Sequence, residues 1–219
     1  MVPTVCAMTT TIMTFGDSNT YGTPPALARG EMRRFDARTR WPMVMQDALG
    51  ADYHVIEEGL PGRTTVLGDP IMGAHMDGRT GLKIALESQG PIDLLTIMLG
   101  TNDAQTHHAR SAEQIAGGLA SLLYIARSEP YQTRHQGFDI LLIAPPPVVE
   151  QGTYRDSLLG AAAKTTALTG LIAELAAHWG VQFFDAGAHI STSPIDGVHF
   201  AADDHRVLGH ALATAITAA

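Results

Sequence analysis

Three side chains of the types used in nucleophilic catalysis lie far apart in the sequence. Ser18 directly follows a short apolar run that ends near Gly16, whereas Asp196 and His199 lie close to the other end of the chain. Within residues 196–199 a turn can bring the carboxylate to one ring nitrogen of the histidine, while the other nitrogen faces a serine hydroxyl. Such an acid, base and nucleophile would support acyl transfer, although a serine at this place can equally be a helix cap.

Acyl transfer also needs hydrogen-bond donors aimed at the oxygen that becomes negative in the tetrahedral intermediate. Three donors follow different predicted strands: the N–H groups of Ser18 and Gly59 and the side-chain amide of Asn102. Gly59 suits this use because it lacks a Cβ and lets a substrate oxygen approach the backbone. Alternatively, Gly59 is an ordinary turn glycine and Asn102 a turn residue. The chain order of these elements and the complete set of chemical roles favour the catalytic interpretation.

Short apolar runs rich in Ile, Val, Leu and Phe predict buried strands, and they alternate with helical patterns. The predicted strands are Thr11–Phe15, His54–Ile56, Asp93–Leu99, Asp139–Ala144 and Val181–Phe184. The predicted helices are Trp41–Leu49, Leu82–Glu87, Ala112–Ala126, a stretch within Ser157–His178, and Asp203–Thr217. This alternation predicts an α/β fold, a three-layer α/β/α sandwich with a five-stranded parallel sheet. Ligands of such sheets bind beyond the carboxyl ends of the strands.

Length and composition fit one globular domain. The 219 residues are 45% hydrophobic and 16% charged, so we expect a single domain over residues 1–219, with a poorly ordered N-terminal extension over residues 1–10. A formal net charge of −8 without a local run of Lys or Arg disfavours nucleic acid and anionic membranes as partners. The single cysteine, Cys6, and the lack of a charged, apolar leader predict a cytoplasmic protein.

Residue spacing disfavours metal and nucleotide sites. His107 and His108, and His205 beside Asp203 and Asp204, form no His-Glu-x-x-His or comparable ligand set, and adjacent histidines are expected to point apart. We therefore predict solvated surface at these histidines and no metal site. The loop after the first strand lacks the glycine and lysine patterns that hold phosphates, which disfavours a nucleotide enzyme.

Four sequence blocks together resemble the SGNH, or GDSL-type, hydrolase family. They span nearly the whole chain and read Gly16-Asp17-Ser18, Gly59, Gly100-Thr101-Asn102-Asp103 and Asp196-Gly197-Val198-His199. Further segments resemble the arylesterase and acyltransferase subgroup, typified by a mycobacterial acyltransferase; these are residues 57–60 with 63–65, 97–103 and 183–187. Some members of that wider group are similar to carbohydrate acetylesterases. The chain departs from a compared member of that subgroup at Tyr21, where that member has tryptophan, and in its Pro61-Gly62 pair, which that member lacks, so acyl and alcohol preferences are not carried over.

The resemblance implies a serine esterase with a flavodoxin-like sheet, an oxyanion hole formed by Ser18, Gly59 and Asn102, and no cofactor. It implies a small ester substrate, cleaved through an acyl-serine intermediate, with acyl transfer to alcohols as a second outcome. Substrate contacts are expected from Asp17, Tyr21, Leu60, Asp103 and Val198. Bulky groups near Ser18 predict a preference for short, acetyl-type esters. The competing class is a non-catalytic module that binds carbohydrate or protein on the same fold.

Two long connections, Thr23–Arg40 and Val66–Thr80, carry glycine, proline and charged residues. Connections of this length are usually functional or ordered by a partner, which predicts lids or subunit contacts. In the subgroup that the chain resembles, such insertions are associated with an octamer that narrows access to the site. The resemblance therefore implies a homo-oligomer, with an octamer as the specific expectation.

Overall fold

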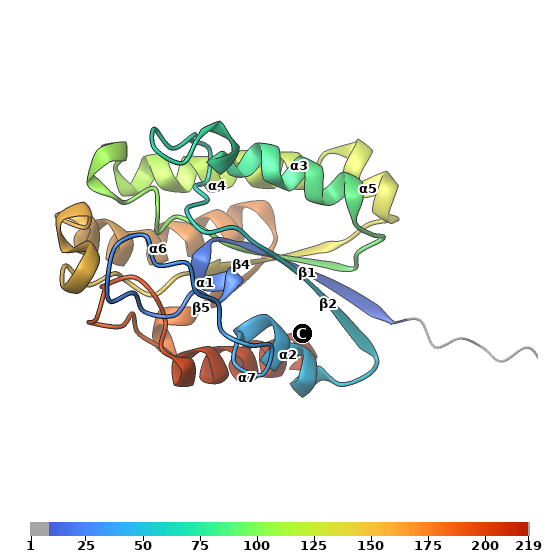
Figure 1. The fold of residues 1–219 in the computed structure, drawn as a ribbon. Coiled ribbons are helices and arrows are strands. Elements are labelled where there is room, and N and C mark those ends of the chain that lie inside the picture. Colours follow the sequence, from blue (N-terminus) through green and yellow to red (C-terminus); the bar gives the residue numbers. More distant parts are fainter. Residues whose placement is uncertain (1–8, 219) are drawn as a thin grey trace, which may run out of the picture.

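A parallel sheet forms the centre of the computed structural model, which describes residues 9–218 (Figure 1). Its strands are β1 (Thr10–Gly16), β2 (Tyr53–Gly59), β3 (Leu94–Met98), β4 (Asp139–Ala144) and β5 (Gln182–Asp185). They lie in the order β2-β1-β3-β4-β5, which confirms the predicted five-stranded, flavodoxin-like sheet. Of the predicted N-terminal extension, residues 1–8 lie outside the described residues, and Thr10 already belongs to β1.

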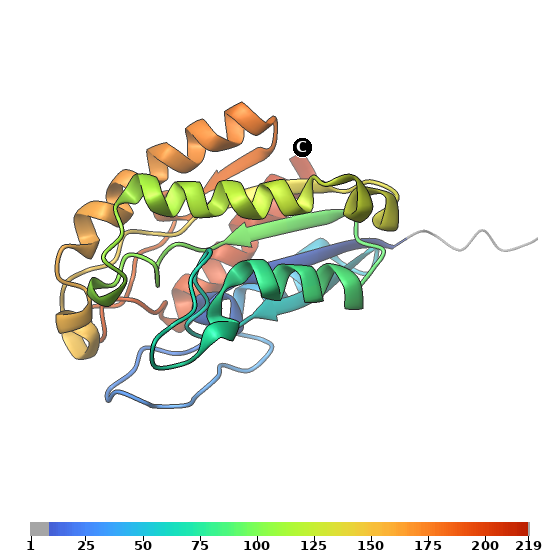
Figure 2. The same cartoon turned by 90° about the horizontal axis from the view of Figure 1, so that it is seen from above.

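Helices cover both faces of the sheet and complete the predicted three-layer sandwich. The α-helices are α1 (Ser18–Tyr21), α2 (Trp41–Leu49), α3 (Gly78–Ser88), α4 (Ala112–Ala126), α5 (Glu129–His135), α6 (Ala161–Trp179) and α7 (Ala202–Ala218). The 3₁₀ helices are η1 (Ala74–Met76), η2 (Thr106–His108), η3 (Gly152–Ser157) and η4 (Ala186–Ala188). Figures 1 and 2 show α2 and α7 on one face, and α3, α4 and α6 on the other. Within residues 9–218, none of these helices combines the length and apolar composition that crossing a bilayer requires.

The sheet is buried on both faces because each face packs against one helical layer. On β1, Ile12 belongs to the apolar cluster that contains Trp41 and Leu208, from α2 and α7. The next residue, Met13, belongs to the opposite cluster, which contains Leu82 of α3. Successive side chains of a strand point to opposite faces, so a strand buried on both sides is a continuous apolar run. The strands thus form a rigid frame for the loops at their ends.

Two of the helical predictions need correction. Helix α3 begins at Gly78 rather than at Leu82, because Asp77 caps it by accepting a hydrogen bond from the N–H of Arg79 at 2.9 Å. Helix α5 has no counterpart among the predicted helices, although Pro130 stands in its first turn. Its 7 residues make too few turns for a helical period of apolar residues to be recognised.

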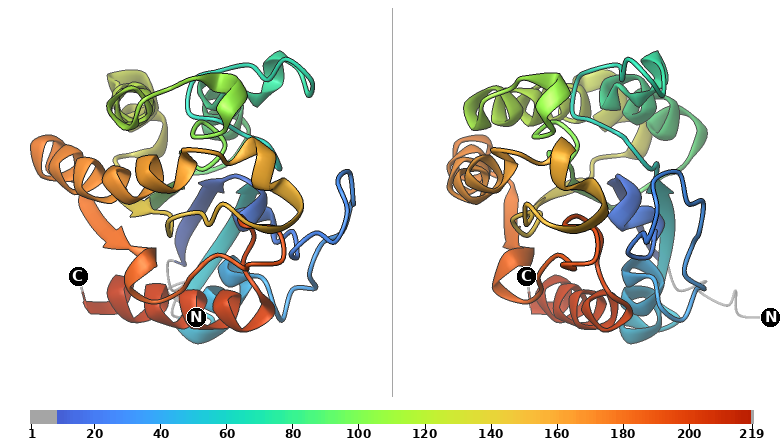
Figure 3. Two further views of the ribbon diagram at one scale, coloured as in Figure 1. Left: turned by 90° about the vertical axis from the view of Figure 1, so that its left-hand side faces the viewer. Right: turned by 60° about the vertical axis from the view of Figure 1, so that its left-hand side comes forward.

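The carboxyl ends of β1, β2 and β3 lie at the same edge of the sheet. Gly16, the last residue of β1, pairs with Gly59 of β2 and with Met98 of β3. The chain order of the strands reverses at β1, and ligands of open α/β sheets bind at such a switch point. Figure 3 turns this edge toward the viewer and shows α1 among the connections that follow β1, β4 and β5.

Candidate active site

Ser18 is the first residue of α1, directly beyond the end of β1. Asp17 caps this short helix, its Oδ1 accepting a hydrogen bond from the N–H of Asn19 at 2.9 Å. Gly16 allows strand and helix to lie this close, because a Cβ at position 16 would be 2.0 Å from Thr20 Oγ1. The position of the Ser18 hydroxyl is therefore set by the backbone, at a residue that is only 5% exposed.

His199 and Asp196 continue from Ser18 in a row of hydrogen bonds. His199 Nε2 lies 3.0 Å from Ser18 Oγ, and His199 Nδ1 lies 2.6 Å from Asp196 Oδ2. Since Nδ1 donates to the carboxylate, Nε2 is left to accept from the serine hydroxyl. In this geometry an imidazole can take a proton from a hydroxyl and return it to a leaving group. The structure brings the three residues together, as their predicted chemistry requires.

Backbone donors hold Asp196 in place as a charged acceptor. Its Oδ1 accepts from the N–H groups of Val198 and His199, both at 3.0 Å, and its Oδ2 accepts from the N–H of Ala26 at 2.7 Å. Burial opposes ionisation, but the hydrogen bond and charge of His199 lower the pKa of Asp196 below its ordinary value. Gly197 has a φ of +86°, and a Cβ there would be 2.2 Å from a backbone oxygen, so the turn requires glycine.

Asn19 links the serine helix to the histidine segment, a role that no sequence pattern indicates. Its Nδ2 donates to Val198 O at 3.2 Å, and its Oδ1 accepts from the N–H of Phe200 at 3.2 Å. These two bonds flank His199, so Asn19 fixes the distance between α1 and the imidazole. An asparagine beside a strand end is typical of turns, which is why the sequence gives no sign of this role.

Gly59 lies at the same edge as Ser18, as predicted, and the structure gives a reason for glycine at this position that the sequence analysis did not consider. It pairs in register with Gly16, and a Cβ on Gly59 would be 2.2 Å from the backbone nitrogen of Tyr21. Glycine is therefore required by the close contact between β2 and α1. The predicted reason was the approach of a substrate oxygen, and the helix contact is sufficient without it.

Asn102 is held with part of its amide unused. Its Nδ2 donates to Arg63 O at 3.0 Å, and its Oδ1 accepts from Gln105 Nε2 at 3.0 Å. An amide nitrogen carries two hydrogens, and Arg63 O is its one acceptor among residues 9–218. The second hydrogen is therefore free to donate to a bound oxygen.

Arg63 is a buried cation behind these loops, and its structural role has no sequence signal. Its Nη1 donates to Gly16 O at 2.8 Å and also to Glu58 O. Its guanidinium carbon lies 4.0 Å from the centroid of the Phe15 ring, within the range of a cation–π interaction. Burial lowers the pKa of Arg63 to about 10, against the charges of Glu58 and Asp17. Arg63 thus stays charged at neutral pH and ties the ends of β1 and β2 together.

Several of the predicted substrate contacts have structural partners instead. Asp103 is fully buried and accepts from Thr65, from the N–H at 2.9 Å and from Oγ1 at 2.5 Å. The prediction of substrate contact is therefore wrong for Asp103, because its side chain has no surface that a ligand could touch. Asp17 is the buried cap of α1, and the Val198 side chain packs in the apolar core. These motif residues hold the loops in position.

Tyr21 and Leu60 are partly exposed beside the site. Tyr21 ends α1, and the guanidinium carbon of Arg34 lies 4.3 Å from the centroid of its ring. Tyr154 on η3, which the sequence analysis does not single out, packs edge-on against the ring of His199 with 6.0 Å between centroids. Tyr154 therefore borders the row of hydrogen bonds, and substrate contact at Tyr21 and Leu60 stays a prediction.

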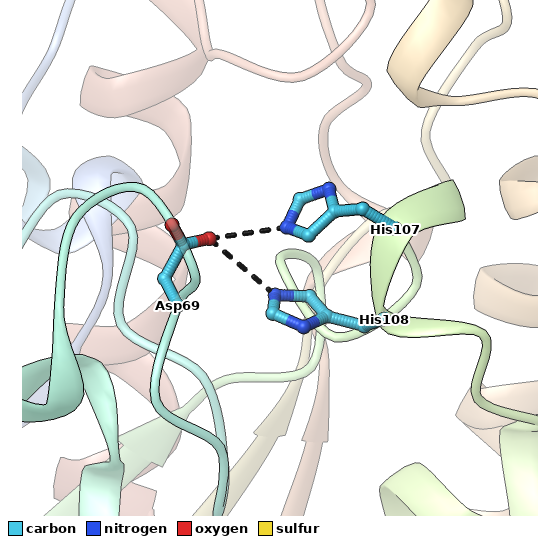
Figure 4. A group of neighbouring side chains, drawn as sticks. All are labelled: Asp69, His107 and His108. Carbon is cyan, nitrogen blue, oxygen red and sulfur yellow. Dashed lines mark hydrogen bonds and ion pairs between the residues drawn. The ribbon is translucent and has the colours of Figure 1, made fainter.

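Two predictions about histidines are wrong. His205 is not solvated: it lies on the face of α7 that packs against α2, its Nδ1 accepts from the N–H of Trp41 at 3.3 Å, and burial lowers its pKa to about 3. His107 and His108 do not point apart. Their ring centroids are 4.0 Å apart, and both rings turn toward Asp69, as Figure 4 shows. Independent rotamers bring both side chains of η2 to one carboxylate.

Both the sequence and the fold are similar to those of known proteins. Residues 14–211 match the family described as GDSL-like Lipase/Acylhydrolase. Among solved structures, a carbohydrate acetylesterase from Sinorhizobium meliloti has a TM-score of 0.90 and 37% identity, over 95% of this chain and 99% of that chain. The aryl esterase of M. smegmatis has a TM-score of 0.89 and 36% identity, over 95% and 99% of the two chains. No curated protein matches the sequence.

Proposed function

The chain belongs to the GDSL-like lipase/acylhydrolase family and is a carboxylic ester hydrolase, and on this premise we propose that Ser18, His199 and Asp196 are its catalytic residues. The observation that carries the proposal is the row of hydrogen bonds, 3.0 Å between Ser18 Oγ and His199 Nε2 and 2.6 Å between His199 Nδ1 and Asp196 Oδ2. This row supplies a nucleophile, a general base and a carboxylate that orients the base.

In the first half of the reaction, Ser18 Oγ attacks the ester carbonyl carbon while its proton passes to His199 Nε2. Asp196 stabilises the imidazolium that forms. The carbonyl oxygen becomes negative and accepts hydrogen bonds from the N–H groups of Ser18 and Gly59 and from Asn102 Nδ2. When the bond to the alcohol oxygen breaks, His199 returns the proton to the leaving alkoxide, and the acyl group stays on Ser18.

In the second half, water takes the place of the departed alcohol. His199 removes a proton from the water, whose oxygen attacks the acyl carbon, and the same donors hold the second tetrahedral intermediate. Breaking the bond to Ser18 Oγ releases the carboxylic acid, and the serine regains its proton from His199. An alcohol in place of water gives a new ester, so acyl transfer belongs to the same proposal.

A direct test compares wild type with Ser18→Ala in the release of nitrophenol from nitrophenyl acetate. Loss of the nucleophile should remove nearly all turnover while the protein stays folded, as measured by circular dichroism. A protein that only binds carbohydrate or another protein on this fold would show no turnover that depends on Ser18. Equal turnover by the two proteins would therefore refute the assignment.

The proposed substrates are short acyl esters of aryl or carbohydrate alcohols. The similar structures from S. meliloti and M. smegmatis are described as a carbohydrate acetylesterase and an aryl esterase. Tyr154 packs against the ring of His199, and the bulky residues Tyr21 and Leu60 belong to the loops that carry Ser18 and Gly59, which favours small acyl chains. We expect kcat/KM to fall along nitrophenyl esters from acetate to laurate. A pocket that accepts added methylenes would instead gain roughly 0.8 kcal/mol per CH₂. A rising series of kcat/KM would therefore contradict the predicted short-chain pocket, but not the assignment of Ser18, His199 and Asp196 as catalytic residues.

The proposal extends to a homo-oligomer, specifically an octamer, that works in the cytoplasm. Exposed apolar side chains on the two long connections support the assembly, because exposed apolar surface marks interaction sites. These residues are Leu27, Met32, Ile71 and Met72, which are 73%, 92%, 90% and 46% exposed. The single cysteine is compatible with a reducing compartment. Light scattering of the purified protein measures the assembly, and a monomeric mass would contradict it.

A further inference from the structure

A second cluster of possible metal ligands lies apart from the row that contains Ser18. Asp69 Oδ2 and an imidazole nitrogen from each of His107 and His108 all lie within 4.8 Å of one another. Figure 4 shows both rings turned toward the carboxylate. The distances from Oδ2 to Nε2, 3.0 Å for His107 and 3.7 Å for His108, bracket the separation of about 3.3 Å between two ligands of a tetrahedral zinc ion. These two separations therefore suit one such ion, and the two imidazole nitrogens lie within 4.8 Å of each other.

Asp69 presents a single oxygen in a fixed direction. Its Oδ1 accepts from the N–H groups of Ile71 and Met72, both at 2.7 Å. The backbone closes the same turn, because Asp69 N donates to Gly73 O at 3.0 Å and Gly73 N donates to Asp69 O at 2.8 Å. With Oδ1 occupied and the turn closed, Oδ2 is left for the histidines. Hydrogen bonds of this kind orient the ligands of metal sites.

We propose that Asp69, His107 and His108 bind one divalent transition-metal ion of the zinc class, a site that goes beyond the proposed ester hydrolysis and does not depend on it. Two imidazoles and one carboxylate suit Zn²⁺, Co²⁺ or Ni²⁺, whereas Mg²⁺ and Ca²⁺ prefer sets of oxygen ligands. The side chain of His107 is 32% exposed, so water can complete the coordination.

The ion joins the connection after β2 to the connection after β3, which also carries Asn102. His107 and His108 lie on η2, in the connection after β3 that also carries Asn102, whereas Asp69 lies in the connection after β2. Directly before η2, Gln105 donates from Nε2 to Asn102 Oδ1 at 3.0 Å. Metal binding therefore fixes one of the two predicted lid segments to the loop of Asn102. The expected consequence is a higher resistance of this region to unfolding.

The test titrates Zn²⁺ by calorimetry into tag-free protein that a chelator has stripped of metal. Asp69→Asn is the sharpest variant, because asparagine keeps an acceptor for the N–H groups of Ile71 and Met72 and replaces only the oxygen that faces the histidines. His107→Gln removes a second ligand at an exposed position. His75→Gln is the matched control, since His75 is an exposed histidine of the same connection outside the cluster. Mg²⁺ is the control ion, and circular dichroism verifies that each variant folds.

Wild type and His75→Gln are expected to bind one Zn²⁺ per chain, and both ligand variants to bind it at least about tenfold more weakly. Zn²⁺ should raise the midpoint of thermal unfolding of the first two proteins and leave that of the ligand variants nearly unchanged. The proposal is overturned by the absence of saturable binding to wild type, by equal affinity of Asp69→Asn, or by Mg²⁺ binding as tightly as Zn²⁺. None of these measurements depends on ester turnover.

Discussion

Two groups in the molecule pair histidine with aspartate, and they are arranged for different chemistry. At the carboxyl edge of the sheet one ring lies between two partners, with His199 Nδ1 against Asp196 and Nε2 against Ser18. In the connection after β3 the Nε2 atoms of two rings approach one oxygen of Asp69. The first arrangement can pass a proton along a row. The second can hold a cation between its members.

The placement of backbone donors separates the two aspartates. Both oxygens of Asp196 accept from backbone N–H groups, and the oxygen facing the imidazole also takes the N–H of Ala26. Asp69 receives its backbone donors on Oδ1 alone, which leaves Oδ2 to the histidines. In both residues burial opposes ionisation and hydrogen bonds outweigh it, so each pKa lies below its ordinary value. Identical residue types therefore differ in function through the donors around them.

The largest effect that we expect separates these aspartates directly. Asp196→Asn should lower kcat by about 10⁴-fold, because an amide stabilises the wrong tautomer of the imidazole. Its Nδ2 would also face the N–H of Ala26, which places two donors against each other. Turnover of nitrophenyl acetate at saturating substrate measures the loss, and thermal unfolding of the variant controls for folding.

Asp69→Asn is the matched substitution in the other pair. It should cost less than about tenfold in kcat, or about 1.4 kcal/mol, because Asp69 contributes no atom to the row of hydrogen bonds at Ser18. If both variants lost turnover equally, the assignment of catalysis to one pair alone would be wrong.

A loss smaller than that of Asp196→Asn is expected for Asn102, which lies in the same connection after β3 as His107 and His108. Asn102→Ala should lower kcat by about 10²–10³-fold, since it removes one preorganised donor to the developing oxyanion. Gln105→Ala removes only the bond that orients this amide, so its loss should be in the same direction and smaller. Separate values of kcat and KM decide the point, because a change confined to KM would make Asn102 a ground-state binding residue.

Asp17 tests, through stability rather than turnover, whether hydrogen-bond donors decide the charge of a buried carboxylate. Burial raises the pKa of Asp17 from 3.8 to about 6, against the hydrogen bond from Asn19 and the charges of His199 and Arg63. Because the folded pKa is the higher one, its contribution to stability is complete below about pH 4 and is lost as the pH rises through about 6. Relative to Asp17→Asn, the free energy of unfolding of wild type should fall by about 3 kcal/mol over that range.

Denaturant titrations of both proteins between about pH 4 and pH 7 measure this difference. For Asp196 the sign is reversed, because its lowered pKa means that stability is lost as the pH falls. A difference between wild type and Asp17→Asn that stayed constant or grew with pH would show that one backbone donor suffices to keep Asp17 charged.

Much of the fold, and the edge of the sheet at which the site residues come together, could be predicted from the order of segments along the chain. Ser18, Gly59 and Asn102 each follow an apolar run, and the carboxyl ends of parallel strands meet at one edge. Helices with clear ends were also predictable, since Gly50 stops α2 and Ser111 caps α4. These signals are local, so they survive without knowledge of tertiary contacts.

The contacts that hold the site could not be predicted, because each joins distant segments through a backbone atom. The N–H of Ala26 donates to Asp196, and Asn19 Nδ2 donates to the carbonyl of Val198. These contacts have no sequence signal, because each uses a backbone atom. Membership of a motif also does not show where a side chain points. For this reason Asp103 was predicted to contact substrate, although it is buried and bound by Thr65. The metal cluster depends on rotamers, which spacing alone does not reveal.

Ala26 anchors the first part of the connection between α1 and α2 to the catalytic edge. Its N–H holds Asp196 at 2.7 Å, and its carbonyl accepts from Thr153 Oγ1 at 2.8 Å. Beyond it, residues 27–30 and 32–34 are exposed, and exposed loop tips tolerate changes of length and sequence. Loop grafting or directed evolution confined to residues 28–34 can therefore reshape the surface beside the site for bulkier alcohols while the support of Asp196 stays intact.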